Sequence, residues 1–186
     1  AGVTGNYNGG TNTYTISGSP AVSGGPFNYT VTTAGPCGNV SLGGTINVTA
    51  ASTLVLISGV GTNLQTLCAN TGLTTIVYQV GGTGTGATLS GTLPGGVSGS
   101  YDGDQNLFFI SGTPTGSGTF NFTVTTTGPC ANPSLGGTIT VNPAPTVSLA
   151  AAPGSVCLTQ NSVLTATNGG GTTQLNYSAT GAGVGI

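Results

Sequence analysis

The chain has 186 residues, and its composition excludes most kinds of chemistry before any motif is considered. It contains no Lys, Arg, His, Met or Trp, and its only charged side chains are Asp102 and Asp104. Acid–base catalysis near neutral pH relies on His or on an acid or amine with a shifted pKa, and a Ser or Cys nucleophile needs a base beside it. We therefore expect no enzyme, no catalytic residue and no cofactor. Without Lys or Arg, binding to nucleic acid or to an anionic membrane surface is also not expected.

The apolar residues are numerous and patterned, which favours a folded all-β chain. They make up 36% of the sequence, which is too many for a typical disordered segment. Gly, Thr, Ser and Asn are abundant, and no stripe with the 3.6-residue period of a helix is present. Thr, Val, Ile, Tyr and Phe are typical of strands. No apolar run reaches the roughly 20 residues of a membrane span, so we expect no membrane insertion.

Strands are predicted where apolar and polar residues alternate. The first of these places Phe27, Tyr29 and Val31 on one face, and the next carries Ile46 and Val48. Further strands are predicted, in chain order, at residues 54–58, 73–80, 87–91 and 106–111, then at a segment with Phe120, Phe122 and Val124 on one face, and at one with Ile139 and Val141.

Two long stretches of the sequence, residues 2–48 and 96–141, closely repeat each other at an offset of 93 or 94 residues. A repeat of this period predicts tandem domains rather than a solenoid of small units. About seven short strands with Gly- and Pro-rich turns between them fit an immunoglobulin-like sandwich. The fold class that we expect is therefore all-β, with tandem immunoglobulin-like β-sandwich domains.

The repeat predicts one whole domain between two halves. Residues 1–48 are expected to be the C-terminal half of a domain, residues 49–142 a complete domain, and residues 143–186 the N-terminal half of another. Each half alone would expose an apolar strand face and an unpaired edge. We therefore expect residues 143–186 of one copy to be completed by residues 1–48 of the next, either as separate chains or within one continuous repeat protein.

Each predicted domain has one early and one late cysteine. Cys37 and Cys130 are equivalent in the repeat, and Cys68 and Cys157 each precede the first long strand of their unit. We predict a Cys68–Cys130 disulfide within the complete domain and a Cys37–Cys157 disulfide across copies. Four free buried thiols are the alternative, and zinc is disfavoured because the chain has no CxxC and no His. Paired cysteines would indicate an oxidising, extracellular setting.

Asp102, Asp104 and Asn106 have the spacing with which a calcium-binding loop begins. The later Glu of an EF-hand is absent, and the matching residues in the first copy carry no charge. A polar hairpin turn is therefore the favoured interpretation. If any metal binds to this chain, we expect calcium at this loop.

Leu107 and Phe109 are expected to face outward from a strand whose Phe108 and Ile110 face the core. The first copy has Thr at both outward positions. An apolar patch on one domain only predicts an interface, unless a neighbouring loop covers it.

Five asparagines begin the N-x-S/T pattern of glycosylation acceptors. Such patterns also arise by chance in a chain this rich in Thr and Asn, so both interpretations stay open. The five are Asn28, Asn39, Asn47, Asn121 and Asn176.

Four segments of the repeat resemble a known family. They are Phe27–Thr33, Ser111–Pro114, Gly128–Cys130 and Gly136–Val141. They resemble the immunoglobulin-like or PKD-like tandem repeats of giant bacterial surface adhesins, of the gliding type exported by type IX secretion. The resemblance implies secretion, a cell-surface or filament location, many tandem domains and no catalytic residues.

Together these features predict a structural subunit of an extracellular filament or sheath whose partners are copies of itself. A net charge of only −2 favours association. Two alternatives are a spacer stalk of a cell-surface adhesin, with surface glycans as a conceivable ligand, and a non-catalytic module of a larger secreted enzyme.

Overall fold

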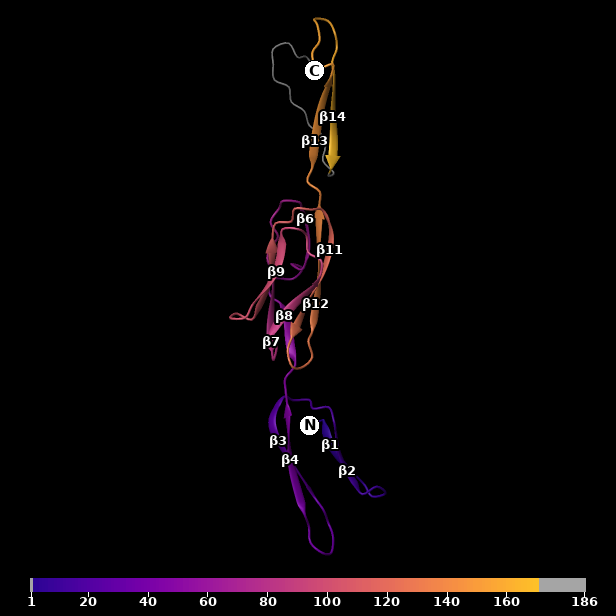
Figure 1. The fold of residues 1–186 in the computed structure, drawn as a ribbon, viewed down its shortest axis with the longest axis vertical. Helices are drawn as coiled ribbons and strands as arrows, with labels where there is room; N and C mark the ends of the chain where they lie inside the picture. The colour runs from indigo at the N-terminus through magenta and orange to yellow at the C-terminus, as the bar shows by residue number, and fades with distance from the viewer. Residues whose placement is uncertain (1, 171–186) are drawn as a thin grey trace.

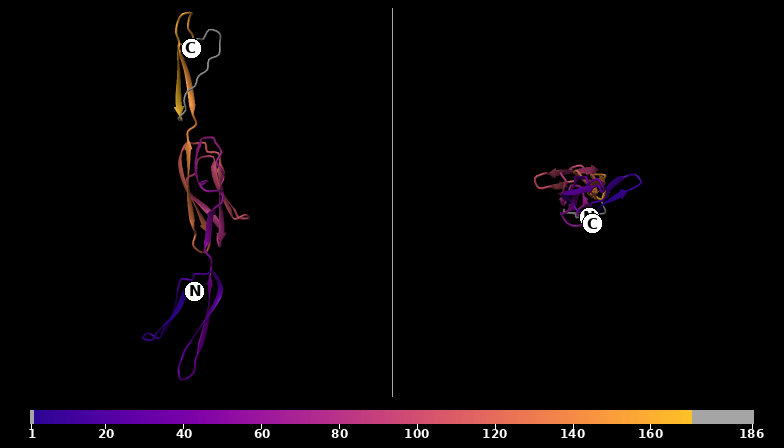
Figure 2. Two further views of the ribbon diagram at one scale, coloured as in Figure 1. Left: turned by 180° about the vertical axis from the view of Figure 1, so that it is seen from behind. Right: turned by 90° about the horizontal axis from the view of Figure 1, so that it is seen from below.

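The computed structural model describes residues 2–170, which form fourteen strands and no helix. The strands fall into three groups that follow one another along the long axis of the molecule, as Figure 1 shows. Strands β1–β4 lie at one end, β5–β12 in the middle, and β13 and β14 at the other end. Figure 2 shows the same row from behind, and the three groups overlap when viewed along the axis.

The middle group is a complete two-sheet sandwich. One sheet has the strand order β5-β7-β10-β9 and the other has the order β6-β12-β11-β8. All neighbouring pairs are antiparallel except β6 and β12, which are parallel. This is the order of an immunoglobulin domain, with β6 as an additional strand beside the last one. The strands are β5 (Ser52–Leu56), β6 (Leu64–Cys68), β7 (Ile76–Gly82), β8 (Gly86–Gly91), β9 (Val97–Asp102), β10 (Leu107–Gly112), β11 (Gly118–Thr127) and β12 (Ser134–Asn142).

The core of this sandwich comes from alternate residues on the facing strands. The core residues come from the two inner strands of each sheet. They alternate along each strand, because successive side chains in a strand point to opposite faces. Phe122 and Val124 of β11 are buried, as the alternation predicted, and so are Ile139 and Val141 of β12. The buried apolar residues that pack together are Ile76, Tyr78, Phe108, Ile110, Phe122, Val124, Ile139 and Val141. The predicted all-β sandwich is therefore confirmed for the middle group.

In the middle group, the strand predictions differ from the structure at four strands. No strand was predicted at β6 or β9. The strand predicted at residues 54–58 is β5, Ser52–Leu56, and the one predicted from residue 73 is β7, which begins at Ile76. Residues 73–75 form a loop in which the side chain of Gln65 accepts a hydrogen bond from the backbone N–H of Thr74 and donates one to its carbonyl. These bonds replace the strand pairing that alternation alone suggested.

The two outer groups repeat parts of the sandwich. Strands β1 (Val3–Asn8) and β2 (Thr13–Gly18) form one hairpin, and β3 (Gly24–Thr32) and β4 (Ser41–Val48) form another. By the repeat, they correspond to β9–β12. At the other end, β13 (Thr146–Ala152) pairs antiparallel with β14 (Val163–Gly170), as β5 pairs with β7. The part of the predicted third domain beyond residue 170 lies outside the described residues.

Candidate assembly surface

The apolar face of β2 and β3 is exposed, although the same face is the core of the middle domain. Tyr14 is 49% exposed, whereas its counterpart Phe108 is 3% exposed. Tyr29 is 40% exposed, whereas its counterpart Phe122 is 2% exposed. The sequence pattern is the same in both places, but the middle domain also contains β5–β8, which have no counterpart in the β1–β4 group.

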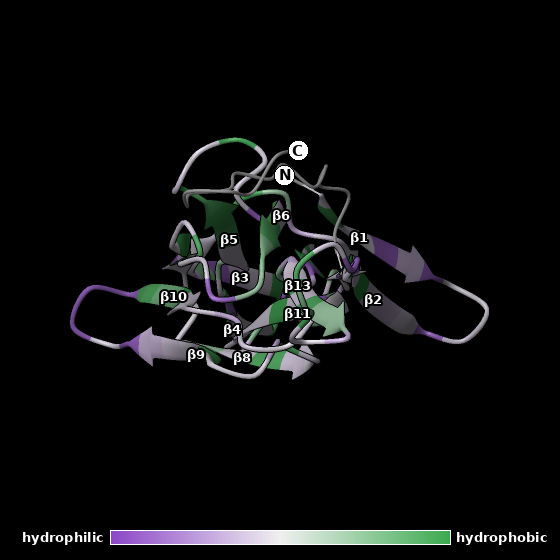
Figure 3. Cartoon of the chain, turned by 90° about the horizontal axis from the view of Figure 1, so that it is seen from above, coloured by the Kyte–Doolittle hydropathy of each residue, from purple (hydrophilic) through white to green (hydrophobic). Residues whose placement is uncertain are grey.

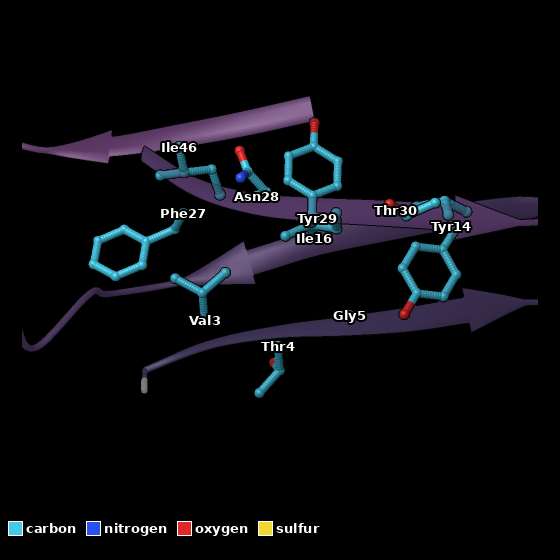
Figure 4. A pocket seen from close by; sticks show the side chains of 11 residues that line it. Val3, Thr4, Gly5, Tyr14, Ile16, Phe27, Asn28, Tyr29, Thr30 and Ile46 are labelled. Atoms are coloured by element: carbon cyan, nitrogen blue, oxygen red, sulfur yellow. The ribbon is translucent and has the colours of Figure 1, made fainter. Parts of the chain in front are cut away.

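The two hairpins border an open groove. One part of it has a volume of about 290 Å³ and lies between β1–β2 and β3–β4, where Tyr14 lies against Gly5, as Figure 4 shows. The adjoining part has a volume of about 360 Å³ and is mostly apolar. It is lined by Val3, Pro20, Val22, Phe27, Ile46 and Val48.

Three strand edges in this group have no partner among residues 2–170. In the middle domain, β10 pairs with β7, β11 with β8 and β12 with β6. Within the described part of the chain, the corresponding strands β2, β3 and β4 pair only within their own hairpins. The missing partners are the counterparts of β6, β7 and β8, and unpaired edges of this kind are ready to accept another strand.

The β13–β14 hairpin offers part of what is missing, because it corresponds to β5 and β7. It is also largely exposed, with Val147, Leu149, Val163 and Leu164 each 64–67% exposed. The described part of the chain thus has an exposed apolar hairpin at one end and, at the other end, an apolar groove without such a hairpin.

The predicted Cys68–Cys130 disulfide is wrong: neither cysteine is bonded in the structure. Because β6 runs parallel to β12, Cys68 lies beside Asn142, the last residue of β12. Cys130 precedes Ser134, the first residue of β12. The eight steps of β12 span about 26 Å at about 3.3 Å per residue, whereas a disulfide requires Cα atoms within about 7 Å of each other. Cys37 and Cys157 are also unbonded within this chain, which leaves their predicted pairing across copies untested.

The Asp102–Asn106 segment forms the turn of the β9–β10 hairpin. The carboxylate of Asp102 accepts hydrogen bonds from the backbone N–H groups of Asp104 and Gln105 and from the side-chain amide of Gln105. Tyr101 donates its hydroxyl hydrogen to Asn106. These bonds support the hairpin-turn interpretation. Residues 2–170 hold no group of three or more His, Cys, Asp or Glu side chains placed to bind a metal ion.

The same turn occurs in the first copy without a carboxylate. Asn8 accepts a hydrogen bond from the backbone N–H of Gly10, and Tyr7 donates to Asn12. Asn12 and Asn106 both have a positive φ, of 53° and 56°. Figure 3 shows the two hairpins, β1–β2 and β9–β10, projecting on opposite sides of the long axis. The acidic residues are therefore one of two ways to make this turn.

Leu107 and Phe109 lie on the outer face of β10, and both are half-buried. Phe108 and Ile110, on the inner face, are buried in the core. Phe109 is next to Val77 of β7 across the strand pair, so part of its surface is already covered. Whether this patch serves as an interface stays a prediction.

The asparagines of the glycosylation patterns lie mainly on exposed strand positions. Asn28 and Asn121 are both exposed, as expected for the solvent faces of β3 and β11. The side chain of Asn121 accepts a hydrogen bond from the Thr138 hydroxyl. Asn39 and Asn47 are also exposed, whereas Asn176 lies outside the described residues.

No pattern in the sequence indicates the environment of Tyr78. This side chain is fully buried in the core, and its hydroxyl has no hydrogen-bond partner among the described residues. Burial raises the pKa of Tyr78 above its ordinary value, because the low-dielectric interior disfavours the charged phenolate.

No family model and no curated protein matches this chain. Among solved structures, it is similar to the I-band fragment I67–I69 of titin, with 11% identity and a TM-score of 0.48 over 90% of this chain and 60% of that one. It is also similar to domains 1–6 of the surface layer protein SbsC, with 10% identity and a TM-score of 0.39 over 77% of this chain and 25% of that one.

A third similar structure is the endo-fucoidan hydrolase MfFcnA4 of glycoside hydrolase family 107, with 20% identity and a TM-score of 0.34 over 77% of this chain and 22% of that one. This chain thus spans less than two thirds of each of the three. Because every TM-score is below 0.5, the fold assignment rests on the strand order. The described part of the chain holds no helix that is long and apolar enough to cross a membrane.

Proposed function

We propose that this protein is a structural, non-catalytic subunit of an extracellular filament or sheath, in which copies join end to end. The observation that carries this proposal is the exposed apolar face at Tyr14 and Tyr29, whose counterparts in the middle domain are buried. A second copy supplies the cover: its β13–β14 hairpin takes the place that β5 and β7 occupy in the middle domain. The joined segments then form a further sandwich between two middle domains.

The strand pairing of the middle domain is the template for this further sandwich, which we call the joint. There, β7 pairs antiparallel with β10, and Phe108 of β10 lies opposite Tyr78. In the joint, β14 of one copy takes the same position beside β2 of the next. The row of domains in Figure 1 continues in the same direction, because the groove and the hairpin lie at opposite ends of the chain.

The composition supports a structural role outside the cell. A chain with no Lys, Arg or His has few groups for catalysis and no site at which trypsin cuts. A small net charge reduces the repulsion between copies. The resemblance to surface-adhesin repeats also agrees with secretion. In the alternative function, a spacer stalk of an adhesin, the same joints occur within one continuous chain.

A single substitution in the groove of the 186-residue chain tests the proposal. Ile16 lies on the inner face of β2, and its counterpart Ile110 is fully buried. Ile16→Asp would place an unpaired charge inside the joint, which is strongly unfavourable. We expect the wild-type chain to form long particles in sedimentation and electron microscopy, and Ile16→Asp to remain monomeric.

Thr15→Asp is the matched control, because Thr15 is exposed on the outer face of the same strand. It should assemble like the wild type. A wild-type chain that stays monomeric at hundreds of micromolar, or an Ile16→Asp variant that assembles normally, would contradict the proposal. Ordered helical particles would favour a filament, and single unbranched rows without lateral contacts would favour a stalk.

A further inference from the structure

We propose that disulfides link neighbouring domains across the two junctions that flank each joint between copies. Cys68 bonds to Cys37 of the next copy across the junction at residues 143–145. Cys157 bonds to Cys130 of that next copy across its junction at residues 49–51. This inference rests on the proposed end-to-end assembly. It replaces both pairings that the sequence suggested, and it uses all four cysteines.

Cys68 marks the C-terminal end of the middle domain. It pairs with Asn142 at the end of β12, and the N–H of Ala69 donates to the Asn142 carbonyl at 2.8 Å. Only residues 143–145 separate this point from β13. The Cys68 thiol is exposed there, next to the junction with the following domain.

Cys130 marks the N-terminal end of the same domain. Its carbonyl accepts a hydrogen bond from the Ser52 hydroxyl at 3.4 Å, and Ser52 is the first residue of β5. Only residues 49–51 separate Ser52 from β4. Each end of the middle domain therefore has one cysteine, and the spacer at each junction has three residues.

The outer groups carry their cysteines at the far ends of the chain. Cys37 lies in the loop between β3 and β4, and Cys157 lies between β13 and β14. Figure 1 shows that both of these loops point away from the middle domain. Both thiols are exposed. Neither can reach a cysteine of the middle domain in the same chain, but both are placed to meet another copy.

End-to-end joining brings the cysteines together in two pairs. In the joint, the β3–β4 loop takes the place of the β11–β12 loop, so Cys37 of the next copy lies beside the start of β13, as Cys130 lies beside Ser52. Cys68 of the first copy lies on the other side of residues 143–145. Four residue steps span at most about 14 Å when fully extended. The proposed bond therefore requires the spacer to bend enough to bring the two Cα atoms within about 7 Å.

The second junction repeats the arrangement. Cys157 takes the place of Cys68, so it lies beside Thr49 of the next copy, one residue after β4 ends. Cys130 of that copy lies beside Ser52, across residues 49–51. The same geometry at both junctions explains why every cysteine of the chain lies near the end of a domain rather than in a core.

The chemistry is a balanced two-electron oxidation. Two thiols lose two protons and two electrons and form one S–S bond, and a small disulfide such as oxidised glutathione accepts them and leaves as two thiols. Cys37, Cys68 and Cys157 are exposed and Cys130 is half-buried, so the thiols are accessible to such an oxidant.

Isotope mixing identifies the bonded pairs directly. Equal amounts of the unlabelled and the ¹⁵N-labelled 186-residue chain are assembled in a buffer of reduced and oxidised glutathione. The free thiols are then blocked, and the product is cut with chymotrypsin, since trypsin has no site. We expect mass spectrometry to find Cys37–Cys68 and Cys130–Cys157 peptides, about half of them with one labelled and one unlabelled partner. In Cys37→Ser, only the Cys130–Cys157 peptide should remain.

The outcomes separate this inference from the proposed function. Particles that form normally but contain free thiols, or contain Cys68–Cys130 peptides, would overturn the disulfide pairing and leave the assembly proposal intact. Linked peptides without mixed isotopes would also overturn it, because both bonds must join different copies. A chain that neither assembles nor forms the linked peptides would overturn both.

Discussion

Replacing Tyr14 by Ala removes the side chain whose burial should contribute most clearly to the joint between copies. Tyr14 is 49% exposed and its counterpart Phe108 is 3% exposed, so joining should cover about 46% of the residue. An aromatic residue can bury about 150–250 Å², so this share is about 70–115 Å². At about 25 cal/mol per Å², the expected loss is about 2 kcal/mol. That corresponds to an association about 20- to 30-fold weaker.

The measurement is the critical concentration for assembly, determined by sedimentation with thiols blocked so that disulfides do not contribute. Tyr14→Ala should raise it about 20- to 30-fold. Thr15→Ala, on the outer face of the same strand, should leave it unchanged within twofold. The thermal unfolding of the middle domain serves as a folding check and should be the same in all three proteins. An equal effect of both substitutions would refute the burial of this face in the joint.

Four further predictions concern the middle domain and the response to pH. A Cβ at Gly137 would overlap the buried Phe122 ring and approach the Asn63 carbonyl, so Gly137→Ala should lower the free energy of unfolding by about 1–3 kcal/mol in a urea titration. A Cβ at Gly136 would make only ordinary van der Waals contacts, so the control Gly136→Ala should change this free energy by less than about 0.5 kcal/mol. Tyr78→Phe removes a hydroxyl that has no hydrogen-bond partner among residues 2–170, so it should not destabilise the domain. Burial raises the folded-state pKa of Tyr78, so above about pH 10 the unfolded state releases the phenol proton before the folded state does. The wild type should therefore lose stability above about pH 10, and Tyr78→Phe should lack this part of the pH dependence. Asp102→Asn should keep the hairpin turn, since Asn8 makes it in the first copy, and Asp102→Ala should cost about 1 kcal/mol in the same titration. With no His in the chain, the critical concentration should vary less than twofold between pH 5 and 8, and a larger change would point to a titrating group in the joint.

Alternation of side chains was sufficient to predict the inner face of the long strands. Phe122 and Val124 were assigned to the same face of one strand, and both are buried. Alternation does not reveal β9, because its sequence Val-Ser-Gly-Ser-Tyr-Asp has too few apolar residues to form an alternating pattern. That strand exists because β10 provides its partner, and such tertiary pairing leaves no local signal.

The cysteine pairing failed for a different reason. Sequence order shows that Cys68 comes early in the domain and Cys130 late, but it does not show at which end of the sandwich each one lies. The parallel pairing of β6 with β12 places Cys68 at the C-terminal end, and the bond between Ser52 and Cys130 places Cys130 at the N-terminal end. Both facts depend on contacts between residues more than 70 positions apart, which no local pattern contains.

The most direct test of end-to-end joining is a cryo-electron microscopy structure of the assembled 186-residue chain. We predict β14 of one copy (residues 163–170) antiparallel to β2 of the next (residues 13–18), with Tyr14 and Tyr29 buried in the core of the joint. A structure in which copies contact each other only through their middle domains, with both outer groups exposed to solvent, would contradict it.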